Sequence, residues 1–187
     1  WSMTTERIWT AALAVIGDEI LSGRTQDKNV SQIALWLNLQ GIRLREVRIV
    51  PDVEDEIVDC VNALRGRYDY LFTTGGIGPT HDDITSECVA KAFGVPWVVH
   101  EETRALMAED YARRDPPVEM NAARLRMATL PQGAVPIRCA MTSAPGFTMG
   151  NVHVMAGVPR IMQSMFEALA PSLTGGVPVV RICMRAV

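Results

Sequence analysis

Closely spaced glycines and aspartates occur together in the segment Thr73-Thr-Gly-Gly-Ile-Gly-Pro-Thr-His-Asp-Asp-Ile-Thr-Ser-Glu87. Gly75, Gly76 and Gly78 let the backbone turn tightly and approach a ligand without interference from a Cβ atom. A glycine-rich turn between a strand and a helix directs several backbone N–H groups at one point, which suits a phosphate group. The segment therefore predicts a phosphate-binding loop.

Two aspartates, Asp82 and Asp83, follow these glycines directly. Carboxylates at this place would repel a bare anion, so a divalent metal ion between carboxylate and phosphate is the natural complement. We expect a phosphorylated ligand that is handled with Mg²⁺ or a similar ion.

The elements that must position this loop alternate between strand and helix patterns. Apolar runs predict strands over residues 10–16 and 68–72, and residues 42–50 predict a strand nearer the sheet edge. Helical spacing predicts one helix from Val30 to a stop at Gly41, a second over residues 53–64, and a third from Ile84. This order is typical of an α/β fold with a mostly parallel sheet and helices on both faces.

Ligand sites on such sheets lie beyond the carboxyl ends of the strands. Three loops leave those ends, and each carries acids: first Asp18, Glu19 and Asp27, then Asp52, then the Asp82-Asp83 pair. If the three strands are neighbours, these acids converge on one crevice with the glycines. The sequence has no nucleophilic serine elbow, histidine pair for a metal or Walker-type lysine motif, so it favours a carboxylate–metal–phosphate site.

Structural roles are the alternative for the same residues. Asp52 precedes a predicted helix and could be its N-cap. Thr80 and Asp83 have the spacing of a capping box, so Asp83 could close the start of a helix. The Asp18-Glu19 pair could be solvated loop charge. For Asn29, which starts a similar pattern, helix capping is the favoured interpretation.

The second half of the chain predicts smaller elements. A short helix is expected over residues 121–128, and a small β-hairpin over residues 147–149 and 152–155 with a type I′-like turn at Gly150-Asn151. Pro159 in a first turn predicts a helix that continues to Leu169. A final strand is expected over residues 179–184.

A separate helix is predicted over residues 101–114. Leu106, Met107 and Tyr111 form a small apolar stripe on it, and such a stripe either packs on its own domain or faces a second subunit. We expect the second arrangement, in a homo-oligomer that is a dimer or a trimer.

Composition limits the class of protein. A net charge of −3, from 18 basic and 21 acidic residues, argues against nucleic acid as a partner. No apolar stretch approaches the length of a membrane span and no leader is recognisable, so we expect no membrane partner. Four scattered cysteines without a CxxC pair are typical of reduced core thiols in a cytoplasmic protein. We expect one domain over residues 3–187, with Trp1 and Ser2 as additions before the natural Met3.

Five motifs in this order resemble the molybdopterin-binding domain family, and most closely its CinA-type amino-terminal domains. They are Gly17-Asp-Glu-Ile-Leu-Ser-Gly23 with Asp27 and Asn29, the Asp52 position, Thr74-Gly-Gly-Ile-Gly-Pro-Thr-His-Asp-Asp-Ile-Thr85, Ala144-Pro-Gly-Phe147 and Gly157-Val-Pro159. The resemblance runs from about Ala11 to Phe166. It implies a three-layer αβα fold with a molybdopterin or nucleotide ligand in the crevice.

On this basis we predict that ten residues bind the substrate: Gly17, Asp18, Glu19, Gly75, Gly76, Gly78, Pro79, Thr80, Gly157 and Pro159. In the family branch that transfers AMP to molybdopterin, the acids that match Asp52 and Asp83 carry the metal and catalysis. We therefore predict these two residues as catalytic and as metal ligands, with Asp82 as a third metal ligand.

The resemblance leaves three functions open. CinA-type members are similar to metal-dependent pyrophosphatases that act on ADP-ribose and related dinucleotides, so our leading hypothesis is metal-dependent hydrolysis of a nucleoside diphosphate linkage. The alternatives are adenylyl transfer to molybdopterin, as in molybdenum cofactor biosynthesis, and a non-catalytic pterin- or nucleotide-binding protein.

Two departures from the family patterns bear on this choice. The adenylyl-transferring branch lacks the first acid of the pair, here Asp82, which argues against that alternative. CinA proteins commonly continue into an amidase domain that acts on nicotinamide mononucleotide, whereas this sequence stops at Val187.

Overall fold

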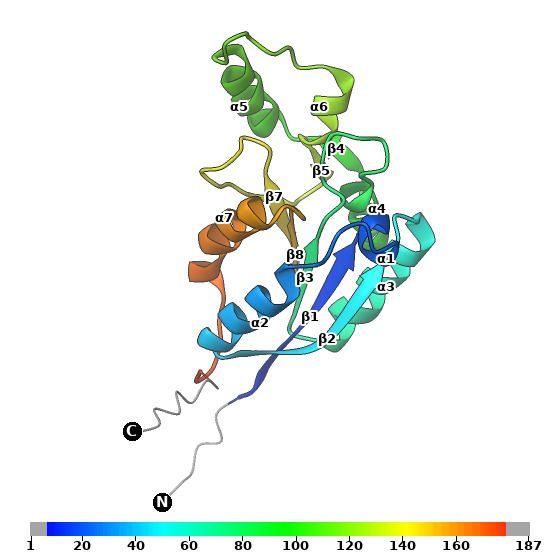
Figure 1. Ribbon diagram of the computed structural model, residues 1–187, viewed down its shortest axis with the longest axis vertical. Helices are drawn as coiled ribbons and strands as arrows, with labels where there is room; N and C mark the ends of the chain where they lie inside the picture. The colour runs from blue at the N-terminus through cyan, green and yellow to red at the C-terminus, as the bar shows by residue number, and fades with distance from the viewer. Residues whose placement is uncertain (1–6, 179–187) are drawn as a thin grey trace, which may run out of the picture.

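A six-stranded sheet in the order β2-β1-β3-β8-β7-β6 forms the centre of the protein (Figure 1). The computed structural model describes residues 7–178, and the strand predicted at 179–184 lies outside them. The strands are β1 (Trp9–Ile16), β2 (Ile42–Val50), β3 (Tyr70–Thr74), β6 (Val135–Ile137), β7 (Gly146–Met149) and β8 (Val152–Met155). β2, β1, β3 and β8 run parallel, and β7 is antiparallel to both of its neighbours. The mostly parallel sheet with β2 at its edge is confirmed.

Helices cover both faces of this sheet, which confirms the three-layer αβα fold (Figure 1). α2 (Asn29–Leu39) and α7 (Pro159–Leu169) pack on one face, and α3 (Glu54–Arg67) and α4 (Thr85–Phe93) on the other. Side chains of β1 alternate between the two cores: Leu13 and Val15 contact the first pair of helices, and Ala12 and Ala14 the second. Because both faces are covered, the strand is apolar throughout instead of alternating with polar residues.

A small lobe stands at one end of the sheet (Figure 1). It contains α5 (Glu101–Ala112), α6 (Ala122–Arg126) and the antiparallel pair of β4 (Trp97–Val99) and β5 (Thr129–Pro131). The helices were predicted, but β4, β5 and β6 were not. Each of these strands has three residues, which is too short for a period of two to be recognised.

Two of the three residues in the apolar stripe of α5 are buried inside this lobe. Met107 and Tyr111 are 0% and 5% exposed and pack with Ala128, whereas Leu106 is 41% exposed. The prediction that the stripe faces a second subunit is therefore wrong for Met107 and Tyr111, which the lobe covers, while Leu106 remains exposed. A homo-oligomer remains a prediction without this support.

The hairpin of β7 and β8 is confirmed, but its turn differs from the prediction. Gly150 has a φ of 56°, and within residues 7–178 only glycines have positive φ, so Asn151 cannot complete a type I′ turn. The Asn151 side chain is used elsewhere: its Nδ2 donates to the carbonyl oxygens of Arg65, Tyr68 and Asp69 at 2.9, 3.2 and 3.2 Å. These bonds fix the hairpin against the chain that enters β3.

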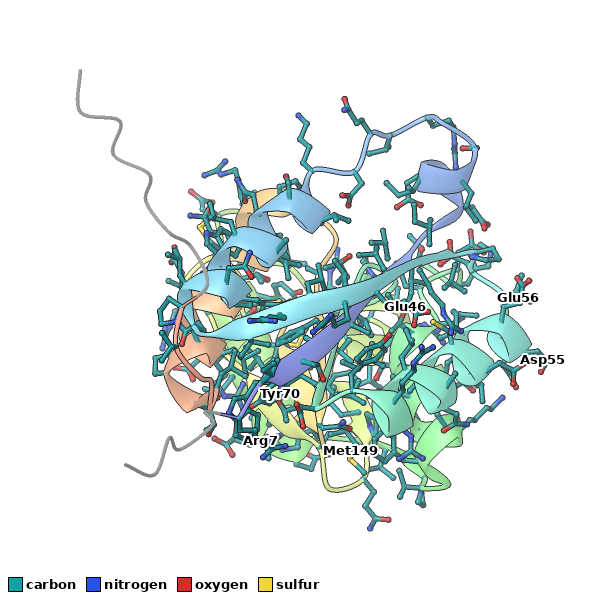
Figure 2. All side chains as sticks on the ribbon, turned by 90° about the horizontal axis from the view of Figure 1, so that it is seen from below. Arg7, Glu46, Asp55, Glu56, Tyr70 and Met149 are labelled. Atoms are coloured by element: carbon teal, nitrogen blue, oxygen red, sulfur yellow. The ribbon has the colours of Figure 1, made fainter. Side chains whose placement is uncertain are left out.

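The strand β3 begins two residues later than predicted because Tyr68 is the C-cap of α3, where its N–H donates to the Leu64 carbonyl at 3.2 Å. The side chains of Tyr68 and Asp69 have partners of their own. The Tyr68 hydroxyl donates to Glu46 at 2.8 Å, and Asp69 accepts from the Thr10 N–H at 2.9 Å. Figure 2 shows Glu46 between β2 and α3. The hydrogen bond from Arg48, followed by that from Tyr68, holds the pKa of Glu46 below its ordinary value.

The structure also bears on the predictions about membrane spans and cysteines. Among the described residues, no helix is long and apolar enough to cross a membrane. Cys60 and Cys88 are buried and form no disulfide, and burial raises the pKa of Cys88 to about 12. This thiol therefore stays protonated and behaves as an ordinary core group.

We predict that Asn151→Ala lowers the free energy of unfolding by about 1–3 kcal/mol, because three carbonyl groups lose their donor. Urea denaturation measures this change. Asn62→Ala is the matched control: Asn62 is exposed on α3 and only accepts from Arg65, so we expect a change within about 0.5 kcal/mol. Equal losses in the two variants would show that Asn151 does not fix the hairpin.

Candidate functional site

The carboxyl ends of β1, β2 and β3 meet, as the sequence predicted, because these strands are neighbours in the sheet. The Gly17 N–H donates to the Val50 carbonyl at 3.0 Å. The Asp18 N–H donates to Asp52 Oδ2, and the Asp52 N–H donates to Asp18 Oδ1, both at 3.1 Å. This reciprocal pair locks the first two acidic loops together.

The glycine loop follows β3 and leaves no room for side chains at two positions. Gly75 and Gly76 have φ angles of 94° and 73°. A Cβ at Gly75 would overlap the Ile16 carbonyl oxygen, and a Cβ at Gly76 would overlap Thr85 Oγ1. The Gly75 N–H donates to the Met155 carbonyl at 3.1 Å. Only glycine fits this backbone.

Three consecutive N–H groups in this loop are available to a ligand. Among the described residues, those of Gly76, Ile77 and Gly78 donate to no other group. α4 begins shortly after them at Thr85, and α7 begins at Pro159, which lines the same pocket. Unpaired N–H groups and helix N-termini together favour an anion such as a phosphate.

Neither predicted catalytic acid caps a helix. The carboxylate of Asp83 accepts from the Thr80 N–H at 3.0 Å and from Thr80 Oγ1 at 2.7 Å, but α4 starts after Ile84 without a side-chain cap. Asp52 likewise precedes Val53, which is the uncapped N-cap position of α3. The capping interpretations are wrong for both aspartates. Helix capping is also wrong for Asn29. At the start of α2, the Val30 N–H donates to the Asp27 carboxylate instead.

A pocket of about 540 Å³, which we call the ligand pocket, lies between the glycine loop, the start of α7 and the small lobe. Eight predicted site residues line it: Glu19, Gly75, Gly76, Gly78, Pro79, Asp83, Gly157 and Pro159. Five others do not: Gly17, Asp18, Asp52, Thr80 and Asp82. The roles of all thirteen in binding or catalysis remain predictions.

The remaining walls of the ligand pocket include residues that the sequence did not single out. The small lobe supplies Met127, and the chain between β6 and β7 supplies Thr142. Next to Met127, the Arg126 guanidinium donates to the Asp83 carbonyl at 3.1 Å and lies over the Trp97 ring. No local pattern marks these residues, because their place depends on how the lobe packs on the sheet.

The acids around the pocket influence one another. Burial raises the pKa of Asp52, the Asp18 N–H opposes this shift, and the charges of Asp18, Glu19 and Asp83 add to it. The site therefore concentrates negative charge beside a loop that is suited to an anion. A ligand that carries both phosphate and a cation would relieve the repulsion.

The three-carboxylate metal site that we predicted does not form. Asp82 is 75% exposed, lies 3.2 Å from His81 Nε2 and does not line the ligand pocket. Within residues 7–178, no three His, Cys, Asp or Glu side chains come close enough to hold a metal ion together. The assignment of Asp82 as a third ligand therefore gains no support from this geometry and remains a prediction. Asp83 and Glu19 are the predicted acids that line the ligand pocket with the glycines, and substrate phosphates would have to supply the other metal ligands.

Comparison with known proteins identifies the family. The model of the probable molybdopterin binding domain matches residues 12–175. The chain belongs to this family. A protein of Pyrobaculum calidifontis is 39% identical over 168 residues, which are 88% of this chain and 63% of that protein. A CinA-like protein of Syntrophotalea carbinolica is 35% identical over 167 residues, which are 87% of this chain and only 40% of that protein.

Solved structures agree with this assignment. The protein CinA of Thermoplasma acidophilum, which its title describes as of unknown function, has a TM-score of 0.80 at 30% identity and covers 88% of this chain and 99% of its own. The CinA-type resemblance is thereby confirmed. The molybdopterin biosynthesis enzyme MoaB of Thermus thermophilus has a TM-score of 0.57 at 19% identity, with 88% and 91% covered, and shares the fold.

We predict that Asp52→Asn stabilises the protein at pH 7 by no more than about 0.5 kcal/mol, because the carboxylate is partly exposed and solvent screens its charge. The folded state binds the Asp52 proton more tightly than the unfolded state, so the wild-type protein loses stability as the pH rises through the pKa of folded Asp52. The amide cannot ionise, yet its oxygen still accepts from the Asp18 N–H. Chemical denaturation between about pH 4 and 7 should show the two proteins converging at the acidic end.

Asp55→Asn is the control for this measurement. Asp55 is exposed in the first turn of α3 and points away from the sheet (Figure 2), so its loss should cost about 0.3 kcal/mol at pH 7. A lower stability of Asp52→Asn than of the wild-type protein at pH 7 would contradict the assigned cause.

Proposed function

We propose that the ligand pocket binds a phosphorylated pterin or nucleotide, with the phosphate on the glycine loop. The observation that carries this proposal is the set of unpaired N–H groups of Gly76, Ile77 and Gly78 at the edge of a pocket of about 540 Å³. Apolar side chains such as Ile77, Met127 and Met165 line the rest of it. Pockets of this size that combine an apolar wall with a few polar groups suit a planar ring.

Family membership supports a molybdopterin-type ligand. A structure of the same fold from Pyrococcus furiosus is named tungsten cofactor synthesizing protein MoaB, with a TM-score of 0.56 at 20% identity and coverage of 89% of this chain and 92% of its own. In the adenylyl transfer that the family resemblance implies, a phosphate oxygen of the pterin would bond to the α-phosphorus of the AMP donor as the donor's phosphoanhydride bond breaks and the rest of the donor leaves. The loop N–H groups would hold the phosphates in place for this step.

In the folded protein, Asp82 lies outside the ligand pocket and so does not oppose adenylyl transfer to molybdopterin. Asp82 is the acid that the adenylyl-transferring branch lacks, but its side chain points to solvent beside His81 and is not a wall of the ligand pocket. The presence of Asp82 therefore leaves the pocket itself unchanged.

Hydrolysis of a nucleoside diphosphate linkage is the second candidate, and the concentration of acids favours it. Asp83 would accept a proton from a water molecule whose oxygen bonds to phosphorus as the phosphoanhydride breaks. Mg²⁺, if held by Asp83 and the substrate phosphates, would neutralise charge on the transferred group. Asp52 accepts from the Asp18 N–H and does not line the ligand pocket, so it would act only through its charge.

We expect Gly76→Ala to weaken binding of molybdopterin and of ADP by more than about tenfold. Its methyl group would overlap Thr85 Oγ1, and alanine at a positive φ costs roughly 1 kcal/mol of stability as well. Gly94→Ala, at the end of α4, has a φ of 66° and open space around the added methyl, so it carries the same backbone cost without the overlap. Calorimetry on both variants tests this prediction. If Gly76→Ala binds these ligands as tightly as Gly94→Ala does, the loop is an ordinary turn with no role in binding.

Asp83→Asn tests the hydrolytic candidate. The amide oxygen keeps the hydrogen bonds from Thr80, so the fold should survive, while release of AMP and ribose phosphate from ADP-ribose with Mg²⁺ should fall by about 100-fold or more. Asp82→Asn, one residue earlier and solvent-exposed, should retain full activity. If the wild-type protein binds ADP-ribose without turnover, or if Asp83→Asn stays active, this second candidate is wrong and the binding proposal stands.

A further inference from the structure

Arg126 joins the small lobe to the chain that leaves the glycine loop. Its Nη2 donates to the Asp83 carbonyl oxygen at 3.1 Å, and its Cζ lies 5.2 Å from the centre of the Trp97 ring. A guanidinium group stacks well on an aromatic face because it is planar and weakly hydrated. The side chain therefore connects two segments that lie 43 residues apart in the chain.

The lobe side of this connection is fixed by its own contacts. The Trp97 indole N–H donates to the Thr129 carbonyl at 2.9 Å and to Ser86 Oγ at 3.0 Å. Two residues after Arg126, the side chain of Ala128 is fully buried in the core of the lobe. The guanidinium is therefore positioned by packed elements of the protein without the help of a ligand.

The charge of Arg126 is not compensated by an acid. Within residues 7–178, its guanidinium makes no salt bridge, and its buried Nε has no hydrogen-bond partner. Burying a cation even in part costs free energy unless an anion or a full set of hydrogen bonds compensates it. The needs of the guanidinium itself therefore do not explain its place, whereas its contact with Asp83 lies directly beside the candidate site.

Asp83 transmits this contact to the glycine loop. Its N–H donates to the Thr80 carbonyl at 3.1 Å, and its carboxylate accepts from the Thr80 N–H at 3.0 Å, so residues 80–83 form a closed turn. The same carboxylate packs against the loop, because a Cβ added at Gly78 would lie 2.7 Å from Asp83 Oδ2. A displacement of this turn would therefore move the end of the loop that carries the free N–H groups.

We propose that Arg126 is a positioning residue for the phosphate site. From the small lobe it holds Asp83, and through Asp83 it holds the Gly78 end of the glycine loop in the arrangement that binds the ligand. This inference rests on the proposed function, in which that loop binds phosphate. Arg126 does not line the ligand pocket, whereas Met127 does, so this part of the lobe both forms a wall of the pocket and supports the loop.

Arg126→Met tests this role, because methionine keeps a long unbranched side chain but has no donor for the Asp83 carbonyl. Arg124→Met is the matched control. Arg124 is also partly buried on α6, donates to the Glu119 carbonyl at 3.0 Å and lies 5.7 Å from the centre of the Tyr111 ring. It makes the same two kinds of contact with partners inside the lobe, and its loss removes the same charge. If Arg126→Met does not fold, Arg126→Gln, which is shorter and polar, replaces it.

The first measurement is amide hydrogen exchange of the ligand-free protein, followed by NMR. Arg126→Met should speed exchange of the Thr80 and Asp83 N–H groups by about tenfold or more, because the turn that protects them loses its support from the lobe. Arg124→Met should leave both rates at the wild-type value. Amides of β1 serve as the reference, so that a global loss of stability is not taken for a local change.

The second measurement is calorimetry with inorganic pyrophosphate in the presence of Mg²⁺. Arg126→Met should bind pyrophosphate about tenfold or more weakly than the wild-type protein, because small displacements of positioned groups have large effects on binding. Arg124→Met should bind it within about twofold of the wild-type protein.

Unchanged exchange of both amides in Arg126→Met would overturn the positioning role. Unchanged pyrophosphate affinity would also overturn it, because the contact would then serve stability alone. Equal weakening in the two variants would trace the effect to the lost charge and would likewise contradict the proposal. If the wild-type protein does not bind pyrophosphate, the proposed phosphate binding is wrong, while faster exchange in Arg126→Met would still show that Arg126 holds the turn.

Discussion

The close approach of three backbone segments is the constraint on which the rest of the structure depends. The glycine loop passes against the end of β1 at Ile16 and against the turn at Gly157, where an added Cβ would lie 3.1 Å from Gly75 Cα. Side chains at these glycines would separate the strands whose ends form the site. The contact also sets where α4 and α7 begin, since each helix starts within ten residues of one of these glycines. The same close contacts therefore shape both the fold and the ligand pocket.

Charge at the site is balanced between two opposite demands. The glycine loop and the helix N-termini favour an anion. Asp52, in contrast, has a raised pKa, mainly because it is partly buried and to a smaller extent because Asp18, Glu19 and Asp83 repel its charge. Repulsion among these carboxylates lowers the stability of the folded protein. Destabilised charge of this kind is typical of sites that handle a charged ligand, because the ligand or its cation supplies the missing compensation.

The small lobe turns an open crevice into a pocket. Ser143 donates to Asp110 at 2.8 Å, and Arg126 donates to the Asp83 carbonyl at 3.1 Å, so the lobe is tied both to the 142–145 loop and to the glycine loop. Met107 and Tyr111 of the α5 stripe pack inside this lobe and stabilise it. A helix that looks unpartnered along the sequence is thus an internal support for one wall of the ligand pocket.

The sequence by itself determined the strand–helix order, the tight glycine loop and the convergence of the acidic loops, because these follow from local periodicity, glycine chemistry and the direction of parallel strands. It also carried the family motifs, which comparison confirmed. Only the tertiary structure decided that Asp82 faces solvent, that Met127 joins the pocket and that Asn29 keeps an unsatisfied oxygen. Each of these depends on contacts between segments far apart in the chain, as between Asn29 and Gly157. Side-chain direction at such contacts is set by packing, and no local pattern of residues records it.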